Sequence, residues 1–308
     1  MAALARAEPG KGRAGLSART ILLTAVAMVA FAANSLLCRL ALGAHEIDAA
    51  SFTTIRVVSG VITLVLISFA QKRLPSRSNA NWRSALALFA YMVFFSFAYI
   101  SLGAANGALI LFGAVQLTMF AAALSAGERF PVLSWSGLAV AVAGLVYLVS
   151  PGLSAPDPLG AALMAVAGIA WGFYSLLGRG APDPLAATTM NFIYCAPLVV
   201  IVSLFSLSQI DLSPIGIAYA IVSGAIASGC GYVIWYAALR GLTAGRAATV
   251  QLSVPVIAAI GAAILLSEPI TLRLVLASAA TLGGVALVLA QRAVPAAKLA
   301  TREPAAGQ

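Results

Sequence analysis

The feature that most constrains this chain is a succession of long apolar segments separated by short polar ones. Ten of them occur, at residues 20–41, 50–71, 83–101, 106–125, 133–150, 159–178, 186–207, 214–239, 246–266 and 272–291. Each is close to the roughly 20 residues that a helix needs to cross the hydrocarbon core of a bilayer. The short connections leave no room for a domain outside the membrane. The sequence therefore predicts an all-α polytopic membrane protein with ten transmembrane helices.

The composition excludes several other classes of protein. Apolar residues fill 62% of the 308 positions, beside only 18 Lys and Arg and 9 Asp and Glu. So little polar surface suits neither a soluble globule nor a disordered chain. The net charge of +9 is scattered between apolar segments, unlike the basic stripe of a nucleic-acid binder. Cys38, Cys195 and Cys230 lie far apart, so neither disulfides nor a metal site are predicted, and no cofactor is expected.

The basic residues predict the orientation in the membrane, because short cytoplasmic connections are enriched in Lys and Arg. With the N-terminus inside, fifteen of the 18 basic residues are cytoplasmic, namely Arg6, Lys11, Arg13, Arg19, Lys72, Arg73, Arg77, Arg83, Arg129, Arg179, Arg240, Arg246, Arg292, Lys298 and Arg302. Residues 1–19 and 292–308 are then cytoplasmic tails of a multi-pass protein in a bacterial inner (plasma) membrane. The first segment imitates a signal peptide around residues 30–33, but its apolar run continues past that point.

An internal repeat relates the two halves of the chain. A shift of 140 positions aligns residues 30–39 (AFAANSLLCR) with residues 170–179 (AWGFYSLLGR), with five identities in ten. The same shift pairs Glu128 with Glu268. One offset that holds across the chain and matches rare charged residues indicates duplication.

Each half contains five spans, an odd number, so the second half must cross the membrane in the opposite sense. We therefore predict two inverted five-helix repeats, at 20–150 and 151–291. Inverted repeats recur in transporters, because two similar halves can rock around a site at the membrane midplane.

The second half resembles a known family. Residues 235–245 (WYAALRGLTAG), then Pro255 and residues 267–271 (SEPIT), look like the second repeat of the EamA family in the drug/metabolite transporter (DMT) superfamily. The first half is similar, with Arg56 in its second span and residues 127–130 (GERF) closing its fourth.

The resemblance covers about residues 20–291 and implies ten helices and the export, less often the import, of amino acids, drugs or other small metabolites. One position departs from the pattern. Val115 stands in the place that matches Pro255, so a helix break at that point is not expected in the first half.

Polar side chains inside spans are candidates for a substrate site, because their burial in hydrocarbon is costly unless they face protein, water or a partner. Asn34 and Ser35 share one face of the first span with Phe31 and Cys38. These two polar residues either contact substrate or only join helices by hydrogen bonds, and the alternatives are equally open.

Trp171 lies near the middle of its span, too deep for the aromatic belt at a membrane surface. With Tyr174, Tyr99 and Tyr236 it is predicted to stack on or close around an amphipathic substrate. Ordinary packing of large aromatic side chains is the alternative.

Two amides also lie inside spans. Gln116, near mid-depth, is the better cavity candidate, because a buried amide must find partners. Gln251 is expected only to bond backbone groups around Pro255, which lacks a helical donor and frees a carbonyl.

Two arginines lie inside spans near the outer face. Arg39 is expected to extend to the lipid headgroups. Arg56 lies about two turns inside the second span. It is expected either to pair with the outer acids Glu46 or Asp48, which we favour, or to bind a substrate carboxylate.

The acidic residues predict how transport is driven. Glu128 and Glu268 end the fourth and ninth spans, where a carboxylate can accept from free N–H groups, so both are interpreted as structural turn residues. No acid lies in the middle of a span, and the single histidine, His45, lies in an outer connection. A buried proton relay is not visible. Facilitated diffusion is favoured over coupling through Glu128 or Glu268.

The sequence offers no nucleophile with a base, metal cluster or phosphate loop, so an enzyme is not predicted. A channel would need a charged ring or a filter. We predict an exporter of amino acids or similar small amphipathic metabolites, working by alternating access, whose partners are this substrate and membrane lipid. An importer or drug efflux carrier of the same family and a non-transporting scaffold remain alternatives. The sequence does not predict the oligomeric state.

Overall fold

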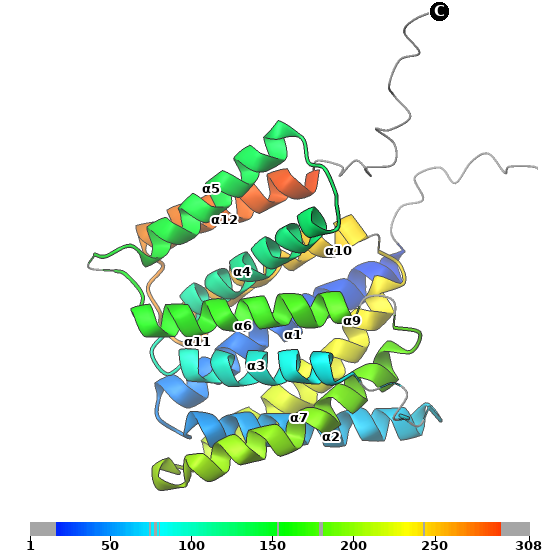
Figure 1. Ribbon diagram of the computed structural model, residues 1–308. Coiled ribbons are helices and arrows are strands. Elements are labelled where there is room, and N and C mark those ends of the chain that lie inside the picture. Colours follow the sequence, from blue (N-terminus) through cyan, green and yellow to red (C-terminus); the bar gives the residue numbers. More distant parts are fainter. Residues whose placement is uncertain are drawn as a thin grey trace, which may run out of the picture.

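The computed structural model describes residues 17–73, 75–76, 79, 81–152, 154–178, 181–242 and 244–290. The elements, most of them labelled in Figure 1, are α1 (Ala18–Gly43), α2 (Ala49–Ala70), α3 (Trp82–Ala98), α4 (Ala104–Ser125), α5 (Val132–Val149), α6 (Pro158–Leu177), α7 (Pro184–Phe205), the short η2 (Leu207–Gln209), α8 (Pro214–Val222), the π-helix η3 (Ser223–Cys230), α9 (Gly231–Leu239), α10 (Ala244–Gln251), α11 (Ser253–Leu265) and α12 (Leu272–Ala290). The predicted tails lie almost wholly outside the described residues.

The all-helical, ten-segment layout is confirmed. In the described part of the chain, nine segments are long and apolar enough to cross a membrane. Two of these combine several elements, since Pro214–Leu239 contains α8, η3 and α9, and Arg246–Leu265 contains most of α10 with α11. The tenth, α3, has 17 residues and ends earlier than predicted. It stops because the Tyr99 amide donates to both Phe95 and Ser96 carbonyls, at 3.3 and 3.1 Å, which tightens the last turn.

Side chains at the helix starts explain where most helices begin. An oxygen of the preceding residue accepts a hydrogen bond from a first-turn N–H group in six helices, the capping residues being Ser17, Asp48, Asn81, Asp157, Asp183 and Ser213. Proline opens α6, α7 and α8, where its missing N–H group costs nothing. The outward faces carry apolar side chains, such as Phe205 and Val132 at 87% and 82% exposed. Lipid is their solvent.

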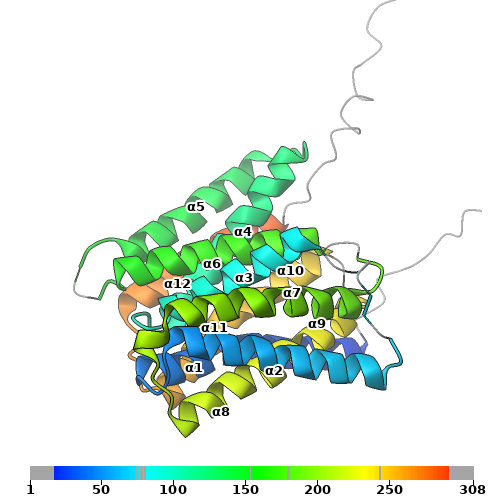
Figure 2. The same ribbon diagram turned by 60° about the horizontal axis from the view of Figure 1, so that its bottom comes forward.

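The packing of the helices shows the repeat in three dimensions. The order α1 to α5 corresponds to α6, α7, α8–α9, α10–α11 and α12. Helix α3 packs on α6 as α9 packs on α1, and α4 packs on α6 as α11 packs on α1. The equivalent pairs α2–α7, α4–α11 and α5–α12 also contact each other. Figure 1 shows α2 and α7 at one side of the bundle and α5 at the other, and in Figure 2 α2 and α8 lie on the side opposite α5. This arrangement agrees with two inverted repeats.

Helices α5 and α12 cross closely because small residues face each other. A Cβ on Gly137 would lie 2.7 Å from the Gly284 carbonyl oxygen, and a Cβ on Gly284 would collide with the Gly137 carbonyl. Thr281 Oγ1 donates to the Ala141 carbonyl at 3.4 Å. Such contacts are typical of helix pairs in membranes. No hydrophobic effect drives helices together in lipid, so close packing of their backbones stabilises the pair instead.

Two spans of the second half are irregular. The eight residues of η3 form a wide π-turn, and Gly224 within it packs directly on the Arg56 carbonyl. The ninth span breaks at Leu252, between α10 and α11, three residues before Pro255. Its counterpart α4 is continuous through Val115, as expected from the absence of proline there.

One end of the bundle, which we call the Glu268 end, is tied by polar contacts between helices. There Arg39 Nε donates to Glu268 Oε1 at 3.2 Å. The connection after α1 contacts the one before α8, since Ser213 Oγ donates to Glu46 Oε2 at 2.6 Å and the Asp211 amide donates to Asp48. These contacts hold the ends of α1, α2, α8 and α11 together.

Candidate substrate-binding site

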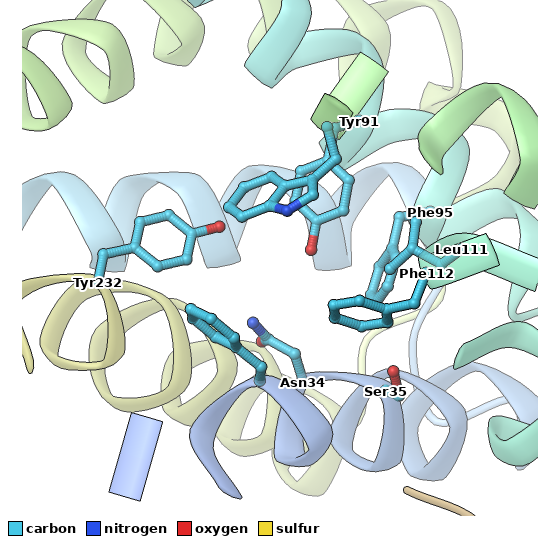
Figure 3. Close-up of a pocket in the computed structure, with 9 residues that line it drawn as sticks. Asn34, Ser35, Tyr91, Phe95, Leu111, Phe112 and Tyr232 are labelled. Atoms are coloured by element: carbon cyan, nitrogen blue, oxygen red, sulfur yellow. The ribbon is translucent and has the colours of Figure 1, made fainter. Parts of the chain in front are cut away.

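A small cavity lies between the two repeats, in the middle part of the spans. Nine residues from α1, α3, α4, α6 and α9 line it, namely Phe31, Asn34, Ser35, Tyr91, Phe95, Leu111, Phe112, Trp171 and Tyr232 (Figure 3). The volume that the centre of a water molecule can reach is about 20 Å³. This is room for about one water. The structure therefore represents a closed form of the site.

Aromatic rings make up most of the wall. The Trp171 ring lies 4.7 Å from Tyr91 and 5.4 Å from Tyr232, measured between ring centres, and 6.5 Å from Phe31. Tyr232 also meets Phe31 edge-on at 6.0 Å. Flat apolar faces together with the tyrosine hydroxyl groups suit a ligand that has both an apolar and a polar part.

The position of Asn34 is compatible with both alternatives that the sequence left open, contact with substrate and the joining of helices. Asn34 lines the cavity, and its amide also joins α1 to η3. Asn34 Nδ2 donates to Ser228 Oγ at 3.2 Å, and Ser223 Oγ donates to Asn34 Oδ1 at 2.7 Å. Ser35 lines the same cavity and is almost fully buried.

Arg56 pairs with neither Glu46 nor Asp48, so the favoured prediction of a structural ion pair is wrong. Glu46 accepts from Ser213, and Asp48 caps α2 through the Ser51 amide at 2.9 Å. Both acids are held at the end of the bundle by these backbone and loop contacts. The Arg56 side chain instead points into the bundle, where it is fully buried.

The surroundings of Arg56 are neutral. Its Nη2 donates to the Tyr91 hydroxyl at 3.2 Å, and both Nε and Nη2 donate to Ser228 Oγ at 3.4 Å. The guanidinium carbon lies 4.9 Å from the Phe95 ring centre and 5.5 Å from that of Tyr91. These two rings line the cavity, so Arg56 lies directly behind its wall.

Four other predicted residues lie outside the lining. Tyr99 is buried and donates to the Ala104 carbonyl at 3.4 Å. Tyr174 packs behind Trp171 with ring centres 5.3 Å apart, and the Tyr236 hydroxyl accepts from Thr188 at 3.3 Å. Gln116 is 7% exposed, and its Nε2 has no partner among the described residues. None of the four contacts the cavity in this closed form.

Arg39 makes contacts within the protein that the sequence analysis did not predict, and its extension to the headgroups stays a prediction. The side chain turns along the end of the bundle to Glu268 and donates to the Tyr99 and Ile100 carbonyls at 3.3 and 3.2 Å. These carbonyls at the end of α3 lack helical donors, so a cation is favourable there.

The ends of the fourth and ninth spans differ in the structure. Glu268 accepts from the Ala104 amide at 2.9 Å, so it holds the start of α4 rather than the helix that follows it. Among the described residues, the Glu128 carboxylate makes no hydrogen bond or ion pair. Gln251 Nε2 donates to the Ala247 carbonyl at 3.3 Å, a backbone contact near Pro255 as expected.

The sequence reasoning missed Tyr91, Phe95 and Tyr232 in the wall. The hydroxyls of Tyr91 and Tyr232 in the middle of spans were the available signal, because a buried tyrosine hydroxyl needs a partner. Phe95 gave no signal, since a phenylalanine inside a span faces lipid as readily as protein.

Comparisons with known proteins agree with this architecture. The EamA-like transporter family matches residues 18–150 and again 158–290. An uncharacterized protein of Pseudomonas aeruginosa is 50% identical over 280 residues, which cover 91% of this chain and 98% of that protein. An uncharacterized transporter of Archaeoglobus fulgidus is 31% identical over 219 residues, 68% of this chain and 77% of that protein.

A solved crystal structure has the same fold, with a TM-score of 0.61 and 18% identity, covering 89% of this chain and 98% of that one. The two family matches fall on the two halves that the packing of the helices relates to each other. The family consists of transporters and not of enzymes. The chain belongs to the EamA-like transporter family of the DMT superfamily.

Proposed function

We propose that the protein exports amino acids or similar small amphipathic metabolites by alternating access around the cavity at Trp171. The observation that carries this proposal is the position of the cavity. Its walls come from both repeats, it lies in the middle part of the spans, and it combines aromatic faces with polar groups. Rocking of one repeat against the other would expose such a site to each side in turn.

The closed form identifies what must change during transport. A volume of about 20 Å³ cannot hold a metabolite, so the cavity has to widen. Opening toward the Glu268 end requires the Arg39–Glu268 ion pair and the contact between Glu46 and Ser213 to separate. Both contacts are polar and partly accessible, so they are cheap to exchange for water.

The distribution of basic residues supports cytoplasmic termini and a bacterial inner membrane, with the Glu268 end outside. Single cysteines introduced beside Glu128 and beside Glu268 can be labelled in intact cells with a membrane-impermeant maleimide. We expect labelling at the second position only. Equal labelling at both positions would contradict an inverted repeat.

Facilitated diffusion fits the site better than proton coupling. Every Asp and Glu of the described residues lies at a helix end or in a connection: Glu46, Asp48, Glu128, Asp157, Asp183, Asp211 and Glu268. No titratable acid therefore faces the cavity, so a proton gradient is not expected to change the flux.

The direct test is flux through the purified protein in liposomes, with labelled amino acids and related metabolites, with and without a proton gradient. Trp171→Ala should reduce the flux by about tenfold or more, because large aromatic contacts dominate such sites. Trp135→Ala is the matched control, since Trp135 is 48% exposed on α5 and remote from the lining.

A scaffold role is the competing function, and the small size of the cavity is the observation that favours it. A scaffold would show no flux for any compound and no difference between the two tryptophan variants. Import or drug efflux would appear in the same assay as the opposite direction or as a different set of transported compounds.

A further inference from the structure

Arg56 carries a charge that nothing in the described protein neutralises. The guanidinium is 0% exposed, yet the ion pair found among the described residues joins Arg39 to Glu268. All the described acids lie at helix ends or in connections, and the hydrogen-bond partners of Arg56 are the neutral hydroxyls of Tyr91 and Ser228. A buried cation without a counter-ion is costly, so a fold retains one where an anion binds.

Not all N–H groups of the Arg56 guanidinium have a hydrogen-bond acceptor among the described residues. Its Nη1 has no hydrogen-bond partner among the described residues, although an arginine carries five N–H donors. Ser228 Oγ already accepts from Nε, Nη2 and the Asn34 amide, at 3.2 to 3.4 Å. The hydroxyl of Tyr232 is likewise buried without a partner. Figure 3 shows the hydroxyls of Tyr91 and Tyr232 directed into the cavity.

The geometry indicates how a ligand reaches the guanidinium. Tyr91 and Phe95 separate Arg56 from the cavity, and the Tyr91 hydroxyl accepts from Nη2 on one side while it faces the cavity on the other. A carboxylate can replace that hydroxyl and bind both Nη1 and Nη2, which a fork-shaped guanidinium favours. The same movement of Tyr91 would widen the cavity, which is otherwise too small.

The cavity offers no comparable binding site for a positively charged group of a substrate. No carboxylate lines the cavity in the described residues. Aromatic rings attract cations through their faces, and the guanidinium already lies over one face each of Tyr91 and Phe95. An ammonium beside them would be repelled by Arg56 through a medium of low polarity.

We propose that this cavity takes small organic anions, that a carboxylate bound at Arg56 is required, and that an ammonium group on the substrate is not. The proposal rests on the proposed transport function of the same cavity and narrows its substrate class. It also gives facilitated diffusion a direction. An inside-negative membrane potential drives a monoanion out of the cell, by about 50-fold in concentration ratio per 100 mV.

The test compares matched compounds on the wild-type protein. One set is 3-phenylpropanoate, phenylalanine and phenethylamine, and a second is propanoate, alanine and ethylamine. Each is measured as flux into liposomes and as a shift of the unfolding temperature of the purified protein. We expect one acid or both to be transported and to bind at least as well as its amino acid, and neither amine to do so.

The outcomes separate this inference from the proposed function. Transport of amino acids without binding of either acid, or binding of an amine as strong as that of its acid, would overturn the anion proposal and leave the carrier role intact. Absence of flux together with absence of binding for all six compounds would overturn both. An inside-negative potential should accelerate efflux of the transported acid and leave that of its zwitterionic amino acid unchanged.

Variants of Arg56 give a second readout. Arg56→Gln should weaken binding of the transported acid by about 30-fold or more while binding of its uncharged amide changes little. Arg273→Gln is the matched control, because Arg273 bonds the Ser150 carbonyl outside the cavity. Equal binding of the acid by Arg56→Gln and wild type would refute the proposal. If Arg56→Gln does not fold, the compound sets on the wild-type protein decide.

Discussion

At the scale of single residues, Asn34 is the position that can supply an internal counter-ion. Ser228 Oγ accepts from Asn34 Nδ2 at 3.2 Å and from Arg56 Nε at 3.4 Å. In Asn34→Asp a carboxylate of the same shape would lie one hydroxyl away from the guanidinium. We expect unfolding at an equal or higher temperature and a loss of acid flux of about tenfold or more, because the cation is already neutralised.

The control for this charge is Gln116→Glu, which also places a carboxylate at a buried position. No hydrogen bond joins this position to Arg56. That variant should be destabilised by about 1–3 kcal/mol, as expected for a buried polar group without partners. A lower unfolding temperature in Asn34→Asp than in Gln116→Glu would contradict the view that Arg56 lacks a counter-ion.

Asp157, at the start of α6, gives a prediction about pH. The Gly160 amide and the Ser101 hydroxyl donate to its Oδ2, at 2.7 and 2.9 Å, and these bonds lower the pKa of the carboxyl below its ordinary value. A lowered folded pKa stabilises the fold above the unfolded pKa, and the stabilisation disappears as the pH falls through the folded value.

Ser101→Ala removes one donor and should raise the pKa of Asp157. The part of the acid-induced fall in unfolding temperature that comes from Asp157 would then be smaller than in wild type and would end at a higher pH, while its onset near the unfolded pKa stays the same. Ser136→Ala is the control, because the Ser136 hydroxyl only donates to the Val132 carbonyl of its own helix. Identical pH profiles for Ser101→Ala and wild type would show that the serine does not act on this carboxyl.

The sequence predicts which residues are polar inside the membrane better than it predicts their partners. Asn34, Ser35 and Trp171 could be placed at the cavity because each lies on an inward face of one helix. The Glu268 partner of Arg39 and the Ser228 partner of Arg56 could not, because each lies more than 150 positions away in the sequence. A long arginine side chain reaches several alternative acceptors, and only the packing of the helices selects one.

At the scale of helices, Glu268 links three elements. Its carboxylate accepts from the Ala104 amide at the start of α4 and from Arg39 at the end of α1, with about a fifth of its side chain exposed. Glu268→Gln should lower the free energy of unfolding by about 0.5–1.5 kcal/mol, through the loss of a charge at a helix N-terminus and of a partly exposed ion pair.

The control is Glu128→Gln, at the position of the first repeat that corresponds to Glu268. The Glu128 carboxylate is exposed and has no partner among the described residues. Its effect should stay within about 0.5 kcal/mol. Chemical denaturation of both variants in detergent measures the difference. Equal destabilisation of the two would show that the contacts at the Glu268 end contribute nothing.

Helix boundaries followed the sequence wherever a capping residue marks them, but two irregularities did not. The run of small residues in η3 is equally compatible with an ordinary α-helix, and its wide turn depends on the close approach of Gly224 to α2. The break at Leu252 lies near Pro255, although proline alone does not fix the residue at which a helix stops.

At the scale of the whole molecule, the two repeats meet closely at α5 and α12, and adjacent glycines test that interface. A Cβ on Gly284 would collide with the Gly137 carbonyl, whereas one on Gly283 would meet nothing within 4 Å. Gly284→Ala should cost about 1–3 kcal/mol through overpacking. Gly283→Ala should be neutral or stabilising by up to about 1 kcal/mol, because alanine favours helix.

Denaturation of the two variants under the same conditions gives both values. Similar stability for Gly284→Ala and Gly283→Ala would mean that α5 and α12 can separate without cost. The duplication itself could be recognised from the sequence through the 140-residue offset. The closeness of this crossing could not, because small residues serve lipid-facing and helix-facing surfaces alike.

The π-helix η3 determines the direction in which the side chains of the following helix, α9, point around the helix axis. An α-helix advances by about 100° per residue, so removal of one residue from η3 would swing α9 by more than a quarter of a revolution. Tyr232 would then turn away from the cavity that it lines. The number of residues in η3 therefore determines which way Tyr232 points, although η3 contributes no side chain to the wall of the cavity.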